Sequence, residues 1–204
     1  MNMGLYAYSL GAIALVTAAV ASSAGRSIPQ PAQRADLAVR ASRVLDVGDM
    51  TIVPGLIDAH VHLAIGGSVR ANALADLRAG FTTVADPGAL RFRWLCCARS
   101  WTHRAHAAGL TIVFGTDGGV LPHGRGVDEM EALVAAGLSP LEVVQAATID
   151  APRALAIGDS VGRLDVGMSA DFVAVRGDPL RDVAALRSVG LVVSRGRIAV
   201  GPPR

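Results

Sequence analysis

The chain has 204 residues, of which 51% are hydrophobic and 18% are charged, so it has enough apolar material for a buried core and is not disordered throughout. The net charge of +2 is too small to indicate a polyanionic partner such as nucleic acid. All 19 basic residues are Arg, which excludes every mechanism that needs a lysine amine.

The N-terminal region begins with an uncharged, largely apolar run over residues 4–24. Its length and its small residues Ala19, Ala21 and Ala24 are typical of a secretory signal peptide, although no basic residue precedes it. A membrane anchor and a leader of no consequence remain open alternatives. We expect an exported or membrane-associated protein if this run acts as a signal or anchor, and a cytoplasmic one otherwise. With the linker that follows, it forms a segment over 1–34.

The folded part begins with β and α/β signals. Alternating residues over 36–46 predict a half-exposed antiparallel strand or a short hairpin, and the apolar run over 56–63 predicts a parallel strand buried on both faces. A helix over 68–79 and a short strand over 81–84 follow. The Arg- and Trp-containing junction over 90–101 has no clear period, and its adjacent cysteines predict no disulfide framework.

The remainder of the chain first combines a predicted strand with predicted helices and then contains predicted strands alone. A strong strand is predicted over 110–116, and helices are predicted at 102–108, 127–136, 139–147 and 150–157. Ser139 and Glu142 have the spacing of a capping box at the start of the third of these helices. Short antiparallel strands are then predicted at 171–176, 191–194 and 197–200. The two β ends are expected to meet in one small sheet domain.

One motif carries metal chemistry. Asp58, His60 and His62 are spaced by two along the predicted strand, so their side chains share a face. Two imidazoles on one face at a strand end can converge on one divalent ion. The motif alone is weak, because two histidines that simply pack or hydrogen-bond at a strand end have the same pattern.

Five segments together resemble the amidohydrolase superfamily of metal-dependent hydrolases, in its imidazolonepropionase-like and Xaa-Pro dipeptidase-like branch. They are PGLIDAHVHL, GFTTVADPGA, HRAHAAGLTIVFGTDGG, the helical region that begins at HGRGVDEM, and VGRLDVGMSADFVAVRGDPL. The resemblance implies a (β/α)8 barrel, of which the strands equivalent to the first, second and eighth are present. It also implies an α/β fold with a composite β-domain over 35–54 and 159–204 and an incomplete barrel over 55–158.

The resemblance assigns roles to further residues. It implies that Asp117 binds the metal and moves protons for the attacking water, although Asp in this sequence context is also a common turn residue. It implies that His123 contacts substrate or completes the metal shell, the alternative being an ordinary loop histidine. His103 and His106 are expected to face away from the site, and Asp86 is expected to serve in a turn.

A large part of the family's barrel has no counterpart. The 12 residues over 90–101 stand where strands three to seven would be, so the lysine or glutamate ligand and two later histidine ligands are missing. We therefore expect at most a mononuclear site for Zn²⁺ or another divalent metal, held by His60, His62 and Asp117. The retained strands would be adjacent, in the order eighth, first, second, which brings these residues together.

The resulting prediction is a hydrolase that cleaves an amide, peptide or cyclic amide C–N bond through a metal-activated water, with Asp117 as the catalytic residue. The alternative is an inactive remnant that serves as an interaction or oligomerisation piece. The expected partners are a small-molecule or peptide-like substrate and further copies of the chain, through exposed sheet edges. Nucleic acid is not expected, and a membrane is expected only if the N-terminal segment is retained.

Overall fold

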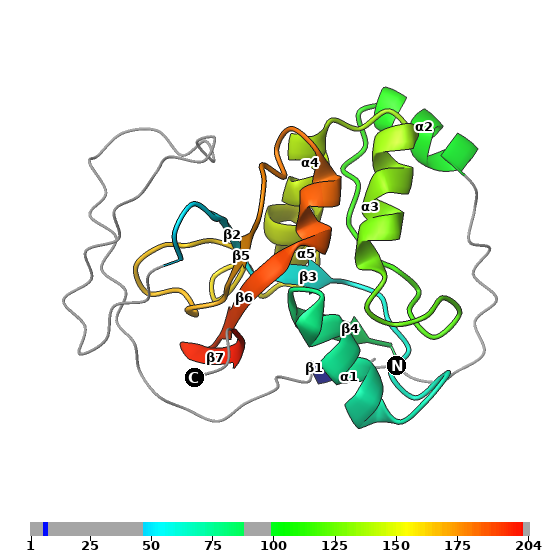
Figure 1. The fold of residues 1–204 in the computed structure, drawn as a ribbon. Coiled ribbons are helices and arrows are strands. Elements are labelled where there is room, and N and C mark those ends of the chain that lie inside the picture. The colour runs from blue at the N-terminus through cyan, green and yellow to red at the C-terminus, as the bar shows by residue number, and fades with distance from the viewer. Residues whose placement is uncertain (1–5, 8–46, 88–98, 202–204) are drawn as a thin grey trace.

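The computed structural model describes residues 6–7, 47–87 and 99–201 and shows an α/β protein with two sheets (Figure 1). Except for Tyr6–Ala7, the predicted leader lies outside the described residues, as do the strand expected over 36–46 and most of the junction. Within the described residues, no helix combines the length and the apolar character needed to cross a membrane.

The first sheet joins distant parts of the chain. Its strands run antiparallel in the order β2 (Thr51–Pro54), β5 (Phe172–Val175), β6 (Val189–Ser194) and β7 (Arg197–Val200). A tight turn links β6 to β7 through Arg195 and Gly196, which have φ values of 51° and 72°, as a type I′ hairpin requires. The strands predicted near the C-terminus therefore pair with one that precedes the α/β part.

The second sheet has the order β1 (Tyr6–Ala7), β4 (Phe81–Asp86), β3 (Leu56–Asp58). Strands β3 and β4 are parallel, and helix α1 (Val69–Arg78) connects them. Helix α1 begins where Ser68 Oγ accepts a hydrogen bond from the Ala71 N–H. The predicted β–α–β unit is present, but its first strand ends at Asp58 rather than at Leu63, so both histidines follow the strand.

The strand predicted over 110–116 is wrong, because the structure has no regular strand there. On one side of this segment, Phe114 O accepts from the Ala59 N–H at 3.0 Å. On the other side, the Phe114 N–H donates to the carbonyl of Ala146, which lies in a helix. The segment therefore runs beside the chain that follows β3 but has no second strand with which to form a ladder.

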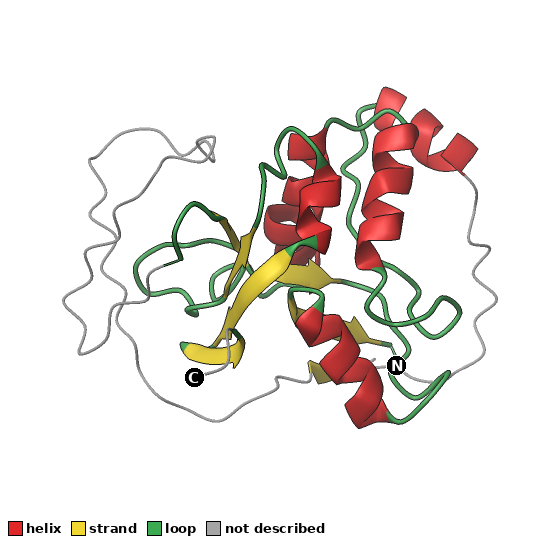
Figure 2. Ribbon diagram, in the orientation of Figure 1, coloured by secondary structure: helices red, strands yellow, loops and turns green. Residues whose placement is uncertain are grey.

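Helices pack beside the second sheet: in Figure 2, drawn in the orientation of Figure 1, most of them form one group above β3 and α1 lies below it. The predicted capping box is confirmed at Ser139 and Glu142. After α1, the helices are α2 (Arg99–Ala107), α3 (Gly126–Ala135), α4 (Pro140–Gln145), the π-helix η1 (Ala146–Asp150), α5 (Ala151–Ala154) and the 3₁₀-helix η2 (Val183–Arg187). The helix predicted over 139–147 thus continues through a π turn into α5.

The larger of the two hydrophobic clusters among the described residues supports the ends of β3 and β4. Leu56, Val61 and Phe114 are fully buried in it. The rings of Phe81 and Phe114 stack with centroids 5.5 Å apart, which ties β4 to the segment that ends in Asp117. The backbone on which the candidate ligands lie is therefore anchored by apolar packing directly below them.

Candidate metal centre

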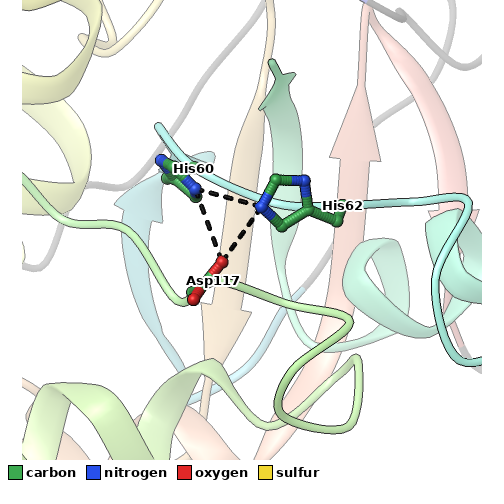
Figure 3. A group of neighbouring side chains, drawn as sticks. All are labelled: His60, His62 and Asp117. Carbon is green, nitrogen blue, oxygen red and sulfur yellow. Dashed lines mark hydrogen bonds and ion pairs between the residues drawn. The ribbon is translucent and has the colours of Figure 1, made fainter. Parts of the chain in front are cut away.

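Three side chains with metal-ligating atoms converge beyond the end of β3 (Figure 3). His60 Nε2 lies 3.2 Å from His62 Nε2, and Asp117 Oδ1 lies 3.4 Å from the former and 3.1 Å from the latter. The side chain of His60 is 34% exposed, that of Asp117 25% and that of His62 12%. The group is thus supported from below and open to solvent on one side.

The backbone brings the two segments together. The His62 N–H donates to Gly118 O at 2.6 Å, and the Asp117 N–H donates to His60 O at 2.8 Å. On the opposite side, the Val61 N–H donates to Ala85 O, beside the end of β4. The sequence predicted the histidines within a strand, but they lie in an irregular segment that follows β3. Backbone hydrogen bonds from this segment still reach the Asp117 segment on one side and the end of β4 on the other.

Asp117 occupies a tight turn. Its φ is +54°, a left-handed conformation that Asp adopts more readily than most residues. The Val120 N–H closes the turn by donating to Asp117 O at 3.0 Å. Gly119 has φ +112°, and a Cβ at this position would lie 2.8 Å from His62 O. The absence of a side chain at Gly119 therefore lets the turn approach the histidine segment closely.

A buried carboxylate, Asp58, joins the two segments below the group. Its Oδ1 accepts from the N–H of His60 at 3.1 Å and of Thr116 at 3.0 Å, and its Oδ2 accepts from the Thr116 hydroxyl at 2.6 Å. Burial raises the pKa of Asp58 to about 7, although these three hydrogen bonds favour the charged form and oppose the rise. Asp58 thus fixes the backbone beside two of the three candidate ligands.

The loop that follows His62 is also fixed. Asn72, buried on α1, donates from Nδ2 to Leu63 O at 2.8 Å and to Ile65 O at 3.0 Å. The Leu63 N–H donates to Asp86 Oδ2 at 3.2 Å. Asp86, predicted as a simple turn residue, therefore ties the end of β4 to this loop.

The donor set fits a divalent metal. Donors about 2.0–2.1 Å from a tetrahedral ion lie roughly 3.3–3.4 Å from one another. The three observed separations, between 3.1 and 3.4 Å, come close to this spacing. Two imidazole nitrogens and one carboxylate oxygen are ligands suited to Zn²⁺, and three protein ligands leave a position open.

The other predicted residues lie elsewhere. His123 is not part of the group of three, whose ligand atoms lie within 4.8 Å of one another; its Nδ1 lies 2.8 Å from Asp76 Oδ2. His103 Nδ1 lies 3.0 Å from Ala136 O, and His106 Nε2 lies 3.1 Å from Glu142 Oε1, so both histidines contact α3 and α4 as outer-helix residues would.

Sequence reasoning missed the contributions of Asp76 and Asn72, and it gave Asp58 no supporting function. Asp76 and Asn72 both lie on α1 and are buried at 6% and 8% exposure. Polar residues at such positions are the one signal that could have been read, because a buried polar side chain needs a partner. The sequence did not indicate which residues those partners were.

Residues 102–199 match the family described as "Amidohydrolase family", which confirms the predicted resemblance over that segment. Ochratoxinase from Aspergillus niger is 35% identical over 102 residues, which are 47% of this chain and 20% of that protein. Dihydroorotase from Bacillus caldolyticus is 51% identical over 47 residues, which are 21% of this chain and 11% of that protein. The chain therefore matches about a fifth or less of these relatives' length.

Two solved structures also resemble this chain over about half of its length. A Xaa-Pro dipeptidase with methionine bound in its active site is 33% identical, with a TM-score of 0.49 over 50% of this chain and 25% of that chain. A putative prolidase from Bifidobacterium longum is 40% identical, with a TM-score of 0.48 over 52% of this chain and 27% of that chain.

Proposed function

We propose that this chain, whose residues 102–199 match the amidohydrolase family, is a metal-dependent hydrolase of carbon–nitrogen bonds. The observation that carries the proposal is the convergence of His60, His62 and Asp117 at separations that suit one divalent ion. The reaction class comes from the family, in which the relatives named above include a dihydroorotase and a dipeptidase. A peptide-like or cyclic amide is therefore the first substrate to test.

The proposed architecture follows from the same resemblance. We assign β3 and β4 to the first and second strands of the family's barrel, and the segment that ends in Asp117 to its eighth. Residues 55–158 would then form the incomplete barrel, and 35–54 with 159–204 the composite β-domain. The hydrogen bonds that join His60 to Asp117 and His62 to Gly118 support the adjacency that this assignment requires.

His60 and His62 would hold the metal, with Asp117 as the third ligand. Zn²⁺ in such a site acts as a Lewis acid and lowers the pKa of bound water towards neutrality. The Asp117 carboxylate would accept a proton from the water whose oxygen adds to the carbonyl carbon. It would then deliver that proton to the leaving nitrogen as the C–N bond breaks. The 25% exposure of the Asp117 side chain leaves it accessible to substrate.

The first test is the metal content of the purified full chain, measured by mass spectrometry of the metal after dialysis against Zn²⁺-containing buffer. We expect about one Zn²⁺ per chain in the wild type and loss of the metal in His60→Ala and His62→Ala. His106→Ala is the matched control, because this histidine contacts Glu142 away from the group and its loss leaves the donors intact.

The second part of the test is turnover. The zinc-loaded wild type should hydrolyse members of a panel of dipeptides, N-acyl amino acids and cyclic amides, and Asp117→Asn should lose that activity. A wild type that binds no metal would contradict the proposed function and leave the inactive remnant as the better description. If the wild type binds metal but hydrolyses no member of the panel, the chain is a metal-binding protein and the proposed hydrolase activity is contradicted.

A further inference from the structure

A buried histidine–carboxylate pair lies between α1 and the loop that follows Asp117. His123 Nδ1 is 2.8 Å from Asp76 Oδ2, and the two side chains are only 5% and 8% exposed. The other oxygen of the same carboxylate, Asp76 Oδ1, accepts from the Gly124 N–H at 2.8 Å. One side chain of α1 therefore holds two consecutive residues of the loop.

The pair is connected to the candidate metal ligands through Gly118. A Cβ at Gly118 would lie 3.1 Å from His123 Cε1 and 3.2 Å from Nδ1, so the histidine ring packs directly against this glycine. Gly118 follows Asp117 in the chain, and its carbonyl accepts from the His62 N–H. A shift of the His123 ring would therefore move the backbone that positions both Asp117 and His62.

The hydrogen bonding of His123 favours a role in orientation over simple space filling. Because a carboxylate accepts hydrogen bonds, the donor to Asp76 is an N–H at Nδ1 of His123, and Nε2 is left for a different partner. Nε2 is buried and has no hydrogen-bond partner among the residues that the structure describes. A buried nitrogen without a partner costs stability, which an apolar side chain of similar size would avoid. What distinguishes the histidine from such a side chain is its bond to Asp76.

We propose that Asp76 and His123 are positioning residues that hold the Asp117–Gly124 loop so that the Asp117 carboxylate stays against His60 and His62. The inference rests on the proposed metal site and replaces the expectation that His123 itself contacts the metal or the substrate. It assigns α1 a direct role in the geometry of the site, because the loop is attached to the helix through one buried carboxylate.

The test compares two substitutions at one position whose side chains branch alike at Cγ. His123→Asn places an amide N–H near the position of Nδ1 and can still donate to Asp76, whereas His123→Leu cannot. We expect His123→Asn to bind Co²⁺ within about threefold of the wild type, with an unchanged visible absorption spectrum. His123→Leu should lose about tenfold or more in affinity and change that spectrum, as expected when support of a ligand is removed.

Controls separate positioning from general destabilisation. The free energy of unfolding of both variants is measured without metal, and trypsin cleavage after Arg125 reports how firmly the loop is held. Equal Co²⁺ affinity and spectra in the two variants would overturn the inference. If His123→Leu does not fold, Asp76→Asn replaces the charged acceptor by a neutral one, and unchanged Co²⁺ affinity in that variant would overturn it equally. If the wild type binds no Co²⁺ or Zn²⁺, the proposed function fails by itself, and the positioning inference is then judged by cleavage after Arg125, which should be faster in His123→Leu than in His123→Asn.

Discussion

At the scale of single residues, Asp58 shows how one buried carboxylate organises two segments. It accepts three hydrogen bonds, one from the His60 N–H and two from Thr116. Burial nevertheless raises its pKa from 3.8 to about 7, so the folded protein retains a proton that the unfolded chain would release. Between these two pH values, the folded state therefore becomes less stable relative to the unfolded state as pH rises.

Asp58→Asn should remove this pH dependence. The amide oxygen can still accept from the His60 and Thr116 N–H groups, but the side chain no longer ionises. We expect the free energy of unfolding of the wild type to fall, relative to that of the variant, between about pH 4 and pH 7, by up to about 1.4 kcal/mol per unit of pKa shift. The measurement is urea denaturation in the presence of a chelator at several pH values.

The exposed Asp159→Asn serves as the control for this prediction, because a solvated carboxylate should leave the pH dependence as in the wild type. Asp58→Ala, in contrast, should destabilise the protein at every pH, since it leaves the two backbone N–H groups and the Thr116 hydroxyl without their acceptor. Parallel curves for Asp58→Asn and the wild type would show that Asp58 is already charged in the folded protein.

The residues of the site differ in how far they could be predicted. His60 and His62 could be proposed because their spacing of two is local, and Asp117 because its segment resembles the family's eighth strand. Asp58 and Asp76 could not be given their roles, because Thr116 lies 58 positions from Asp58 in the chain and His123 lies 47 positions from Asp76. Nothing local in the sequence distinguishes Asp76 from an ordinary helical aspartate. It is the packing of α1 against the loop that makes it a buried acceptor.

At the scale of elements, α4 is fixed at its N-terminus by a capping box. The Ser139 N–H and hydroxyl donate to Glu142 Oε2 at 2.7 Å each, and Ser139 Oγ accepts from the Glu142 N–H at 3.3 Å. The Ser139 backbone and side chain, with His106 in addition, lower the pKa of Glu142 to about 2. Helix α4 leads into the π-helix whose Ala146 carbonyl accepts from the Phe114 N–H, so the cap also supports the segment of Asp117.

Ser139→Ala should lower the free energy of unfolding by about 1 kcal/mol, because the N-cap acceptor of α4 is lost. Urea denaturation at neutral pH measures the change, and Ser160→Ala, an exposed serine in a loop, is the matched control. The stabilisation that Glu142 contributes is present above its unfolded pKa near 4.5 and is lost as pH falls towards 2. Equal stability of the two variants would contradict the role of the cap.

Elements with a complete local signal could be predicted, and those that depend on their neighbours could not. The helices at 68–79 and 139–147 had caps, a stop signal or an apolar period, and they form as α1 and α4. The apolar run over 110–116 resembled a buried strand, but a strand must form a regular ladder with at least one other strand. Here Phe114 O accepts from the Ala59 N–H, which lies beyond the end of β3, and the Phe114 N–H donates to a helix carbonyl. The π turn over 146–150 left no local signal at all.

At the scale of the whole molecule, strand β7 forms an exposed edge of the first sheet. Within the described strands, β7 pairs only with β6, and its residues Arg197, Ile198 and Ala199 are exposed. An exposed strand edge is a template for pairing with another chain, although charged residues such as Arg197 oppose this. The sequence led us to expect self-association through the edges of the incomplete barrel sheet; we predict that β7, in the other sheet, is a further edge for association, because Ile198 there is a large hydrophobic residue with 38% exposure.

We expect the purified chain to self-associate, so that its weight-average sedimentation coefficient rises with protein concentration. Ile198→Arg should shift the protein towards the monomer, since a second cation beside Arg197 disfavours edge-to-edge pairing. Val166→Arg is the matched control: Val166 is 72% exposed but lies outside every described strand. If both substitutions reduce association equally, general surface hydrophobicity drives it rather than the edge. A wild type that stays monomeric over the whole concentration range would show that β7 pairs with no second chain.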